Sequence, residues 1–182
     1  MKAYLIEIPS ESLINSAMER IDYQDAFAID VPLASDALPE KMPILFFKVF
    51  PSWFRGLMYL REFIARRIGL KTAHGMDVEQ HLNNFTGEVG EAIALFKVMG
   101  KNETELLMGE NDKHLDFRLS FFAIPKGQST HMILATTVQF NGWLGKLYFL
   151  PVGPIHRLIV PIVLKRMARR FLKEGETALM MS

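Results

Sequence analysis

The sequence predicts an α+β fold in which an antiparallel sheet packs against a long C-terminal helix. Between residues 91 and 140, four segments with the period-two alternation of strands are separated by short polar turns, which is typical of consecutive antiparallel hairpins. After residue 154, apolar residues recur four apart, which is the spacing of one helix face. Because an antiparallel sheet usually buries one of its faces, this amphipathic helix is the expected cover for it.

The first 90 residues predict one strand followed by helical segments. Residues 22–31 alternate apolar and polar side chains and predict a strand, although Asp25 interrupts its apolar face. Apolar residues at helical spacing predict a helix over residues 52–70. The polar stretch 71–90 has no sustained period and predicts a long connection with about one helical turn.

The remaining residues predict the sheet and its cover. The expected strands are residues 91–100, 104–110, 113–124 and 131–140. A short helix over residues 142–153 and a longer one that starts near Pro154 follow, since proline is well tolerated in the first turn of a helix. One face of the longer helix collects Ile155, Ile159, Val163, Met167 and Phe171, with Leu158 and Ile162 beside them. The opposite side collects Arg157, Lys165, Arg169 and Lys173.

The composition favours a single compact domain over residues 1–182, with its core in about 22–174. A chain of 182 residues suits one hydrophobic core, and 49% hydrophobic with 23% charged residues is a globular balance. The net charge of +1 argues against a nucleic-acid partner, which would require many clustered cations. Because the chain has no cysteine, disulfides, thiolate metal sites and cysteine nucleophiles are excluded, and a cytoplasmic location is expected.

Two apolar stretches resemble a targeting segment and a membrane span, respectively. The apolar run at the N-terminus is interrupted by Glu7, Pro9 and Glu11, so we expect no cleaved leader. Residues 42–60 reach spanning length but contain charged side chains and an internal proline. Because charges are costly in lipid, we expect a buried or interfacial helix there rather than a membrane span.

Four segments carry a resemblance to a known family: DYQDAFAI, HLDFRLSF, TTVQFN and GKLYFLPVGPIHRLIVP. Together with the order of elements they resemble an uncharacterised bacterial family, a domain of unknown function, over about residues 22–170. That family is identified as a member of the START-like superfamily (SRPBCC) of polyketide cyclases and pollen allergens. The resemblance implies a helix-grip fold, in which a curved antiparallel sheet is wrapped around the C-terminal helix and encloses an apolar cavity. It implies no cofactor and no catalytic residue, and family context suggests a dehydrogenase-like partner.

The first candidate site is the predicted strand that contains HLDFRLSF. Its alternate residues would form a charged row of His114, Asp116 and Arg118 on one face, within reach of one another for acid–base chemistry or a polar ligand. The structural alternative, which we favour, is that this row faces water and pairs across strands. The apolar face, with Phe117 and Leu119, would then face the helix and contact a ligand.

The second candidate lies at the start of the long helix. If that helix begins near Pro154, His156 and Arg157 occupy its first turn, where the helix dipole disfavours cations. A neutral His156 could then act as a general base at the cavity mouth. Alternatively, Arg157 pairs with an aspartate such as Asp116 and locks the helix to the sheet, which is the interpretation we favour.

The remaining candidates are aromatic or apolar. Trp143 and Tyr148 offer rings with polar groups, and Ile159 lies on the sheet-facing side of the helix; each is as readily explained by core packing as by ligand contact. No metal site is expected, because His74 and His81 are seven apart and lack the spacing of helical zinc ligands. The sequence also has no G-x-S-x-G motif for a nucleophilic serine.

Three functional hypotheses follow from these observations. The leading one is a protein that binds a small hydrophobic or amphipathic molecule between the sheet and the last helix. The second is a cyclase-, isomerase- or hydratase-like enzyme in the same cavity, so catalysis is left open. The third is a module that uses the basic helix face to bind a membrane surface or a partner, for which a solvated helix face is an equally good explanation.

Overall fold

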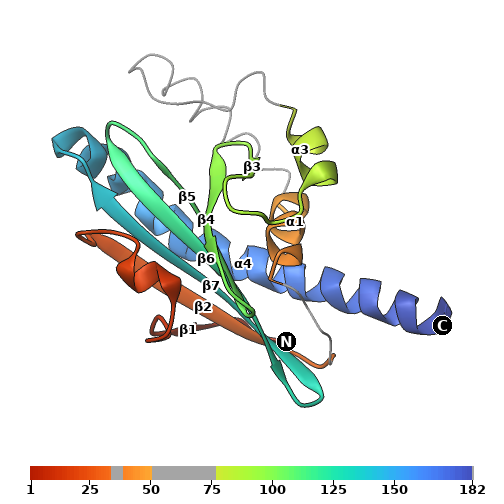
Figure 1. Ribbon diagram of the computed structural model, residues 1–182. Helices are drawn as coiled ribbons and strands as arrows, with labels where there is room; N and C mark the ends of the chain where they lie inside the picture. Colours follow the sequence, from red (N-terminus) through yellow and green to blue (C-terminus); the bar gives the residue numbers. More distant parts are fainter. Residues whose placement is uncertain (34–38, 51–76, 182) are drawn as a thin grey trace.

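The computed structural model describes residues 1–33, 39–50 and 77–181. The helix expected over residues 52–70 lies outside the described residues. Within them, the chain forms one curved antiparallel sheet with a long helix across one face (Figure 1). This is the α+β arrangement predicted from the sequence, and its sheet and C-terminal helix are consistent with a helix-grip-like fold.

The sheet has seven strands in the order β1-β2-β7-β6-β5-β4-β3, and every neighbouring pair is antiparallel. The strands are β1 (Tyr4–Ile6), β2 (Tyr23–Val31), β3 (Ala92–Ile93), β4 (Phe96–Lys101), β5 (Glu105–Asn111), β6 (Leu115–Lys126) and β7 (Ser129–Phe140). The predicted strand over 22–31 and the predicted run of hairpins are therefore confirmed, except that the strand expected over 91–100 is divided into β3 and β4 by a turn at residues 94–95. The edge strand β1 was not foreseen, because three residues are too few for a periodic pattern.

The described helices are the 3-10 helix η1 (Leu13–Ser16) and the α-helices α1 (Lys41–Lys48), α3 (Val78–Asn84) and α4 (Trp143–Met181). Helix α1 confirms a largely buried helix at the start of the apolar stretch 42–60, and α3 is the helical part of the predicted connection. The prediction of two C-terminal helices was wrong, because α4 is one helix that passes through three prolines. Each internal proline costs a backbone hydrogen bond, and we attribute the continuity of the helix to the long apolar face that it packs against the sheet.

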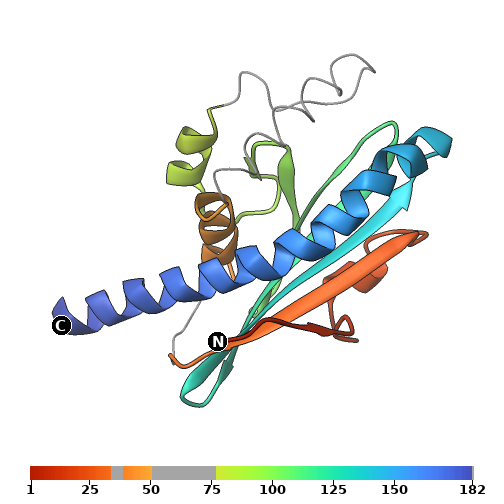
Figure 2. The ribbon, with the colours of Figure 1, turned by 180° about the vertical axis from the view of Figure 1, so that it is seen from behind.

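The main core lies between the sheet and the helices α1 and α4 (Figure 2). The predicted sheet-facing positions Ile159, Val163, Met167 and Phe171 are buried there, against strand residues that include Leu119 and Phe121. The apolar face of β6 therefore packs against the helix, as expected. Leu158 and Ile162 were expected beside this face but point outward, because α4 buries Val160 and Leu164 in their place.

A smaller core covers the other face of the sheet. Ile14 of η1 packs there on Phe122, Ile133 and small β2 residues. The fully buried carboxylate of Glu105 accepts hydrogen bonds from the Ser12 and Ser120 hydroxyl groups and from the Leu13 backbone N–H. The N-terminal segment is thereby held to the back of the sheet, so this part of the second face does not meet water.

Candidate functional site

The most unusual polar side chain in the sheet–helix layer belongs to Asp25. Alternation along β2 places Tyr23, Asp25 and Phe27 on the face that packs against α4, and the register pairs Asp25 with Thr136 of β7. The Asp25 side chain is only 3% exposed. This is the residue that interrupts the apolar pattern in the sequence, so the layer contains a buried carboxylate where an apolar side chain would be expected.

His156 of α4 faces this carboxylate. Its Nδ1 lies 3.1 Å from Oδ2 of Asp25, and its Nε2 lies 3.5 Å from Oγ1 of Thr136. The hydroxyl group of Tyr23 donates to the same Asp25 oxygen at 2.5 Å. The second oxygen, Oδ1, is buried and has no hydrogen-bond partner within the described part of the chain. We call these four residues, Tyr23, Asp25, Thr136 and His156, the Asp25 cluster.

Aromatic and cationic groups surround Tyr23. Its ring lies 4.7 Å from that of Phe149 and edge-on to His156, and the Arg157 guanidinium carbon lies 5.4 Å from its centre. Burial, followed by the hydrogen bond to Asp25, raises the pKa of Tyr23 to about 12, although Arg157 opposes the shift. The Tyr23 hydroxyl group is therefore protonated at neutral pH and remains a donor to Asp25.

The structure corrects the interpretation of His156 and Arg157. Because α4 begins at Trp143, neither residue lies in the first turn, and the expected effect of the helix N-terminus does not apply to them. Arg157 does not pair with Asp116, which lies on the other face of the sheet; it stacks on Tyr23. The aspartate that joins the helix to the sheet is Asp25, and its partner is His156.

The predicted charged row on β6 does not act as one group. Asp116 accepts hydrogen bonds from the Asn141 side chain and the Asp112 backbone N–H. Arg118 is buried, donates to the Phe117 carbonyl group, and has its pKa lowered by burial. The side chain of His114 is partly buried. The expectation that this row faces water was wrong for Arg118, which is buried and donates to backbone carbonyl groups of β5 and β6.

The apolar and aromatic residues predicted to contact a ligand do not line one common site. Leu119 and Ile159 are core residues, and the ring of Phe117 packs 5.0 Å from that of Phe96. Trp143 is exposed on the outside of α4. Tyr148 is partly buried and lies on the same turn of α4 as Phe149. Among the described residues, the centre of the layer is thus occupied by a cluster of buried apolar side chains.

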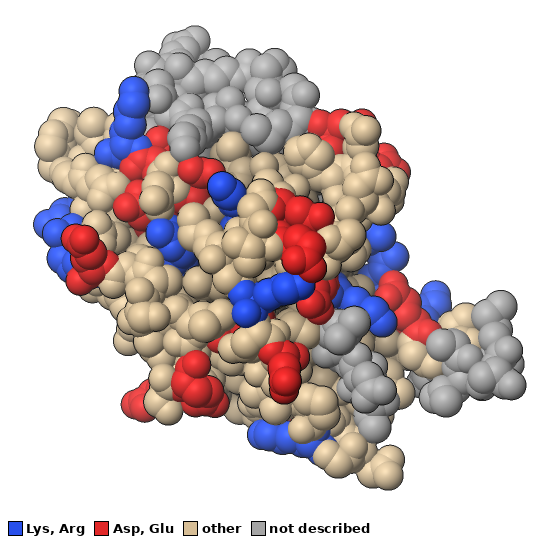
Figure 3. All heavy atoms as spheres, viewed as in Figure 1, with Lys and Arg blue, Asp and Glu red and all other residues tan. Residues whose placement is uncertain are grey.

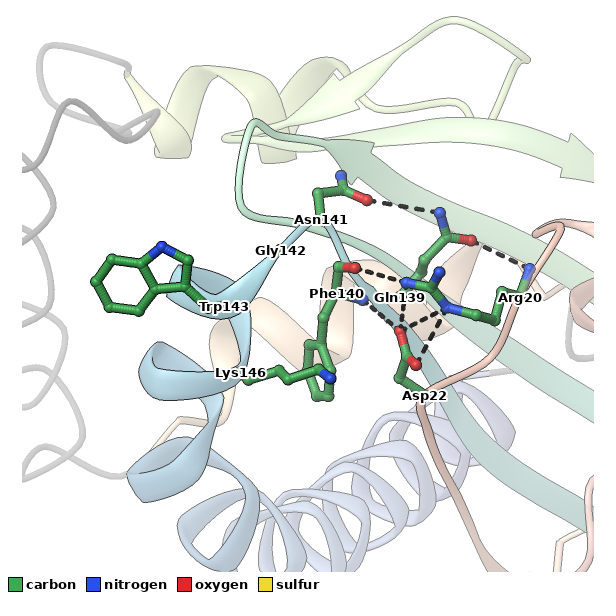
Figure 4. A pocket seen from close by; sticks show the side chains of 8 residues that line it. All are labelled: Arg20, Asp22, Gln139, Phe140, Asn141, Gly142, Trp143 and Lys146. Carbon is green, nitrogen blue, oxygen red and sulfur yellow. Dashed lines mark hydrogen bonds and ion pairs between the residues drawn. The ribbon is translucent and has the colours of Figure 1, made fainter.

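A hollow of about 640 Å³ opens where α4 leaves the sheet (Figure 4). Arg20 pairs with Asp22 at 3.0 Å, and Asp22 accepts from the backbone N–H of Phe140 at 2.7 Å. Burial raises the pKa of Asp22, but these contacts lower it more, so the net shift is downward. The Phe140 ring lies 5.2 Å from Phe149, which itself contacts Tyr23. Two aromatic rings therefore separate this hollow from the Asp25 cluster.

The described residues contain no group of three His, Asp or Glu side chains that could hold a metal ion. His81 instead accepts a hydrogen bond from the Ala94 backbone N–H, and His74 lies outside the described residues. Sequence reasoning found His156 but did not identify Tyr23, Thr136 or Phe149 as its neighbours. The one available signal was the interruption of an apolar strand face by Asp25.

The comparisons with known proteins give a family without an assigned activity. Residues 17–163 match the family described as "Protein of unknown function (DUF2867)". No curated protein and no solved structure matches the chain. Because the match covers most of the sequence, the chain belongs to this family.

Proposed function

We propose that this member of the DUF2867 family binds a small amphipathic molecule whose polar group reaches the Asp25 cluster. The observation that carries the proposal is the Oδ1 atom of Asp25, a buried carboxylate oxygen that has no hydrogen-bond partner among the described residues. An unsatisfied buried acceptor costs about 1–3 kcal/mol, and more when it is charged. A hydroxyl or amine hydrogen of a ligand would remove that cost.

The apolar part of such a molecule would contact the rings beside the cluster. Tyr23, Phe149 and Phe140 form a continuous aromatic series between Asp25 and the hollow in Figure 4. The volume of that hollow falls within the range of small-molecule sites, about 300–1,000 Å³. A shift of both the Phe140 and the Phe149 side chains would join the hollow to the cluster. The binding site would thus lie at the end of the layer, since buried apolar side chains occupy its centre within the described residues.

The antiparallel sheet with a long C-terminal helix also supports a finer proposal, that the family is START-like. Members of that superfamily commonly hold apolar ligands between the sheet and this helix. The fold alone does not assign a function, so the ligand-binding proposal rests on the Asp25 cluster and not on this likeness of fold.

Native mass spectrometry of the gently purified protein tests the proposal. We expect additional mass from a lipophilic molecule that has a hydroxyl or amine group, and its loss in Asp25→Asn. Asp30→Asn is the matched control, because Asp30 lies on the same strand and pairs with His131 at 2.6 Å, but on the other sheet face. Binding of the identified molecule should weaken at least about tenfold in Asp25→Asn alone, which corresponds to about 1.4 kcal/mol.

Two outcomes would contradict ligand binding at this cluster. One is a protein that carries no additional mass and binds none of a panel of fatty acids, quinones and aromatic polyketide mimics. The other is a bound molecule whose affinity changes equally in Asp25→Asn and Asp30→Asn. Circular dichroism of both variants would establish that they are folded.

A second candidate function is acid–base catalysis on the same ligand. The observation that favours it is the His156 ring, which Asp25 orients through Nδ1 while Nε2 remains near the Thr136 hydroxyl group. Cyclase-, isomerase- or hydratase-type reactions all need such a proton acceptor. If the identified ligand is converted by the protein, His156→Gln should lower turnover about 10²- to 10⁴-fold. A ligand recovered unchanged after long incubation would leave binding as the function.

A further inference from the structure

The outer face of α4 exposes a row of large apolar side chains. Trp143, Leu147, Leu150, Leu158 and Ile162 are 71%, 57%, 71%, 70% and 41% exposed, and we call these five residues the apolar stripe. Their spacings of four, three, eight and four residues keep them on one side of the helix. At 1.5 Å per residue the stripe is roughly 28 Å long.

This stripe differs from ordinary surface hydrophobic residues. Single exposed apolar side chains are common, but a contiguous row usually marks a docking surface. The most apolar part of Trp143–Gly175 is long and apolar enough to cross a membrane by composition, and only 28% of it is buried. A core helix would be mostly buried. The stripe is therefore not explained by packing within the described part of the protein.

The same side of α4 becomes cationic after the stripe ends. Lys165, Arg169 and Lys173 follow Ile162 by three, seven and eleven residues, which continues the same helix side. A hollow of about 690 Å³ there is lined mainly by cations: Arg166, Arg169, Arg170 and Lys173, with Glu174 and Thr177. Glu174 pairs with Arg170, whereas Arg169 and Lys173 have no ion pair within the described residues. Among the described side chains, this end of the helix therefore carries more positive than negative charge.

We infer that the outer face of α4 docks in the plane of an anionic lipid bilayer, with the apolar stripe in the acyl boundary and the cationic end on lipid phosphates. A helix with an exposed apolar side and clustered lysine and arginine residues binds such surfaces. Trp143 lies at the start of the stripe, and tryptophan is enriched at the membrane interface. The polar groups of the Asp25 cluster face inward, so this inference does not depend on the proposed ligand.

The fold requires α4 to lie flat rather than to cross the bilayer. Its inner face is packed on the sheet from Ile159 to Phe171, and Figure 2 shows it lying lengthwise across the strands. A transmembrane orientation would carry sheet edges into the hydrocarbon, where unpaired backbone groups are too costly. Docking in the plane of the membrane keeps every strand in water.

The charge distribution favours a bilayer over a second copy of the chain. Helix α4 carries seven lysine and arginine residues and two glutamates, so a second α4 would not neutralise its cationic end. The opposite face of the molecule mixes acidic and basic side chains, without one dominant sign (Figure 3). An anionic surface complements the outer face of α4 and not the face in Figure 3.

Vesicle co-sedimentation of the full chain tests this inference. We expect binding to vesicles of phosphatidylcholine mixed with phosphatidylglycerol, weaker binding to phosphatidylcholine alone, and loss of binding as salt is raised. Leu158→Glu should reduce partitioning about tenfold or more. Leu5→Glu is the matched control, because Leu5 is 68% exposed on β1, outside the stripe, and should partition like the wild type.

A second measurement reports the depth of the stripe. In a Trp53→Phe variant, Trp143 is the one remaining tryptophan, and its emission should shift to shorter wavelength and be quenched by brominated acyl chains. The inference is overturned if no vesicle binds, if binding ignores lipid charge, or if Leu158→Glu binds like Leu5→Glu. It is also overturned if the face instead mediates concentration-dependent self-association that Leu158→Glu abolishes without any vesicle binding.

Discussion

Breaking the Asp25–His156 pair should cost more stability than replacing both residues by apolar ones. The side chain of Asp25 is 3% exposed and that of His156 is 23% exposed. His156→Leu therefore leaves a buried carboxylate with Tyr23 as its one described donor, whereas Asp25→Val leaves an imidazole that can still reach water. The two single variants should not be equivalent.

The expected magnitudes follow from these exposures. His156→Leu removes the imidazole partner of a buried carboxylate, and an unsatisfied buried acceptor costs about 1–3 kcal/mol and more when it is charged, so we expect a loss of about 3 kcal/mol. Asp25→Val should cost about 1 kcal/mol, since it removes one hydrogen bond but adds an apolar group to the layer. The Asp25→Val/His156→Leu double variant should lie within about 1 kcal/mol of the wild type, because an apolar replacement of a buried pair is often neutral.

Urea unfolding followed by circular dichroism would give the four free energies of unfolding in one double-mutant cycle. The single losses add to about 4 kcal/mol and the double variant should lie within about 1 kcal/mol of the wild type, so we expect a coupling energy of about 3–5 kcal/mol, with His156→Leu the least stable variant. A double variant as destabilised as the sum of the two single variants would refute the reasoning. If the double variant is stable but carries no ligand, the polar pair serves binding rather than folding.

Two further predictions concern the Glu105 contacts and the pH dependence of Tyr23. Glu105→Ala should lower the free energy of unfolding by about 3–5 kcal/mol in the same urea experiment, because two buried hydroxyl groups and the partly buried Leu13 N–H lose their acceptor. Glu103 is exposed, so Glu103→Ala should change this free energy by less than about 0.5 kcal/mol. A loss shared equally by the two variants would contradict this. Folding raises the pKa of Tyr23 from 10.0 to about 12, so the folded state favours the protonated hydroxyl group. The contribution of Tyr23 to the free energy of unfolding is therefore complete below pH 10 and is lost as the pH rises toward 12. Tyr23→Phe should reduce this alkaline loss in urea midpoints measured across that range, and an unchanged pH profile would exclude Tyr23 as its cause.

The strands were predictable because their signal is local. In β5, β6 and β7 the side chains alternate between the two faces of the sheet. Turn sequences such as PKGQ mark clearly where one strand ends and the next begins. The inward side of α4 was predictable for the same reason. The start of α4 was not, because Pro151 and Pro154 resemble a helix boundary when read locally, and packing on the sheet overrides that preference.

The candidate site depends on contacts that no local pattern contains. Asp25 and His156 are 131 residues apart in the sequence. They meet because β2 pairs with β7, and α4 crosses both strands where Asp25 lies beside Thr136. The alternation of β2 indicated which face Asp25 occupies, but not what faces it. The sequence likewise placed Leu158 near the buried side of α4, and the rotation of the helix against the sheet turned it outward.

By itself, the sequence determined the fold class, the longer strands and most of the inward face of the last helix, because each follows from a period of two or about four residues. Tertiary structure alone decided that a buried aspartate meets a histidine, and that a row of apolar residues on α4 remains uncovered. Both depend on strand order and helix rotation, which are set by the packing of the whole layer. Residues remote in sequence acquire a common environment only when that packing is complete.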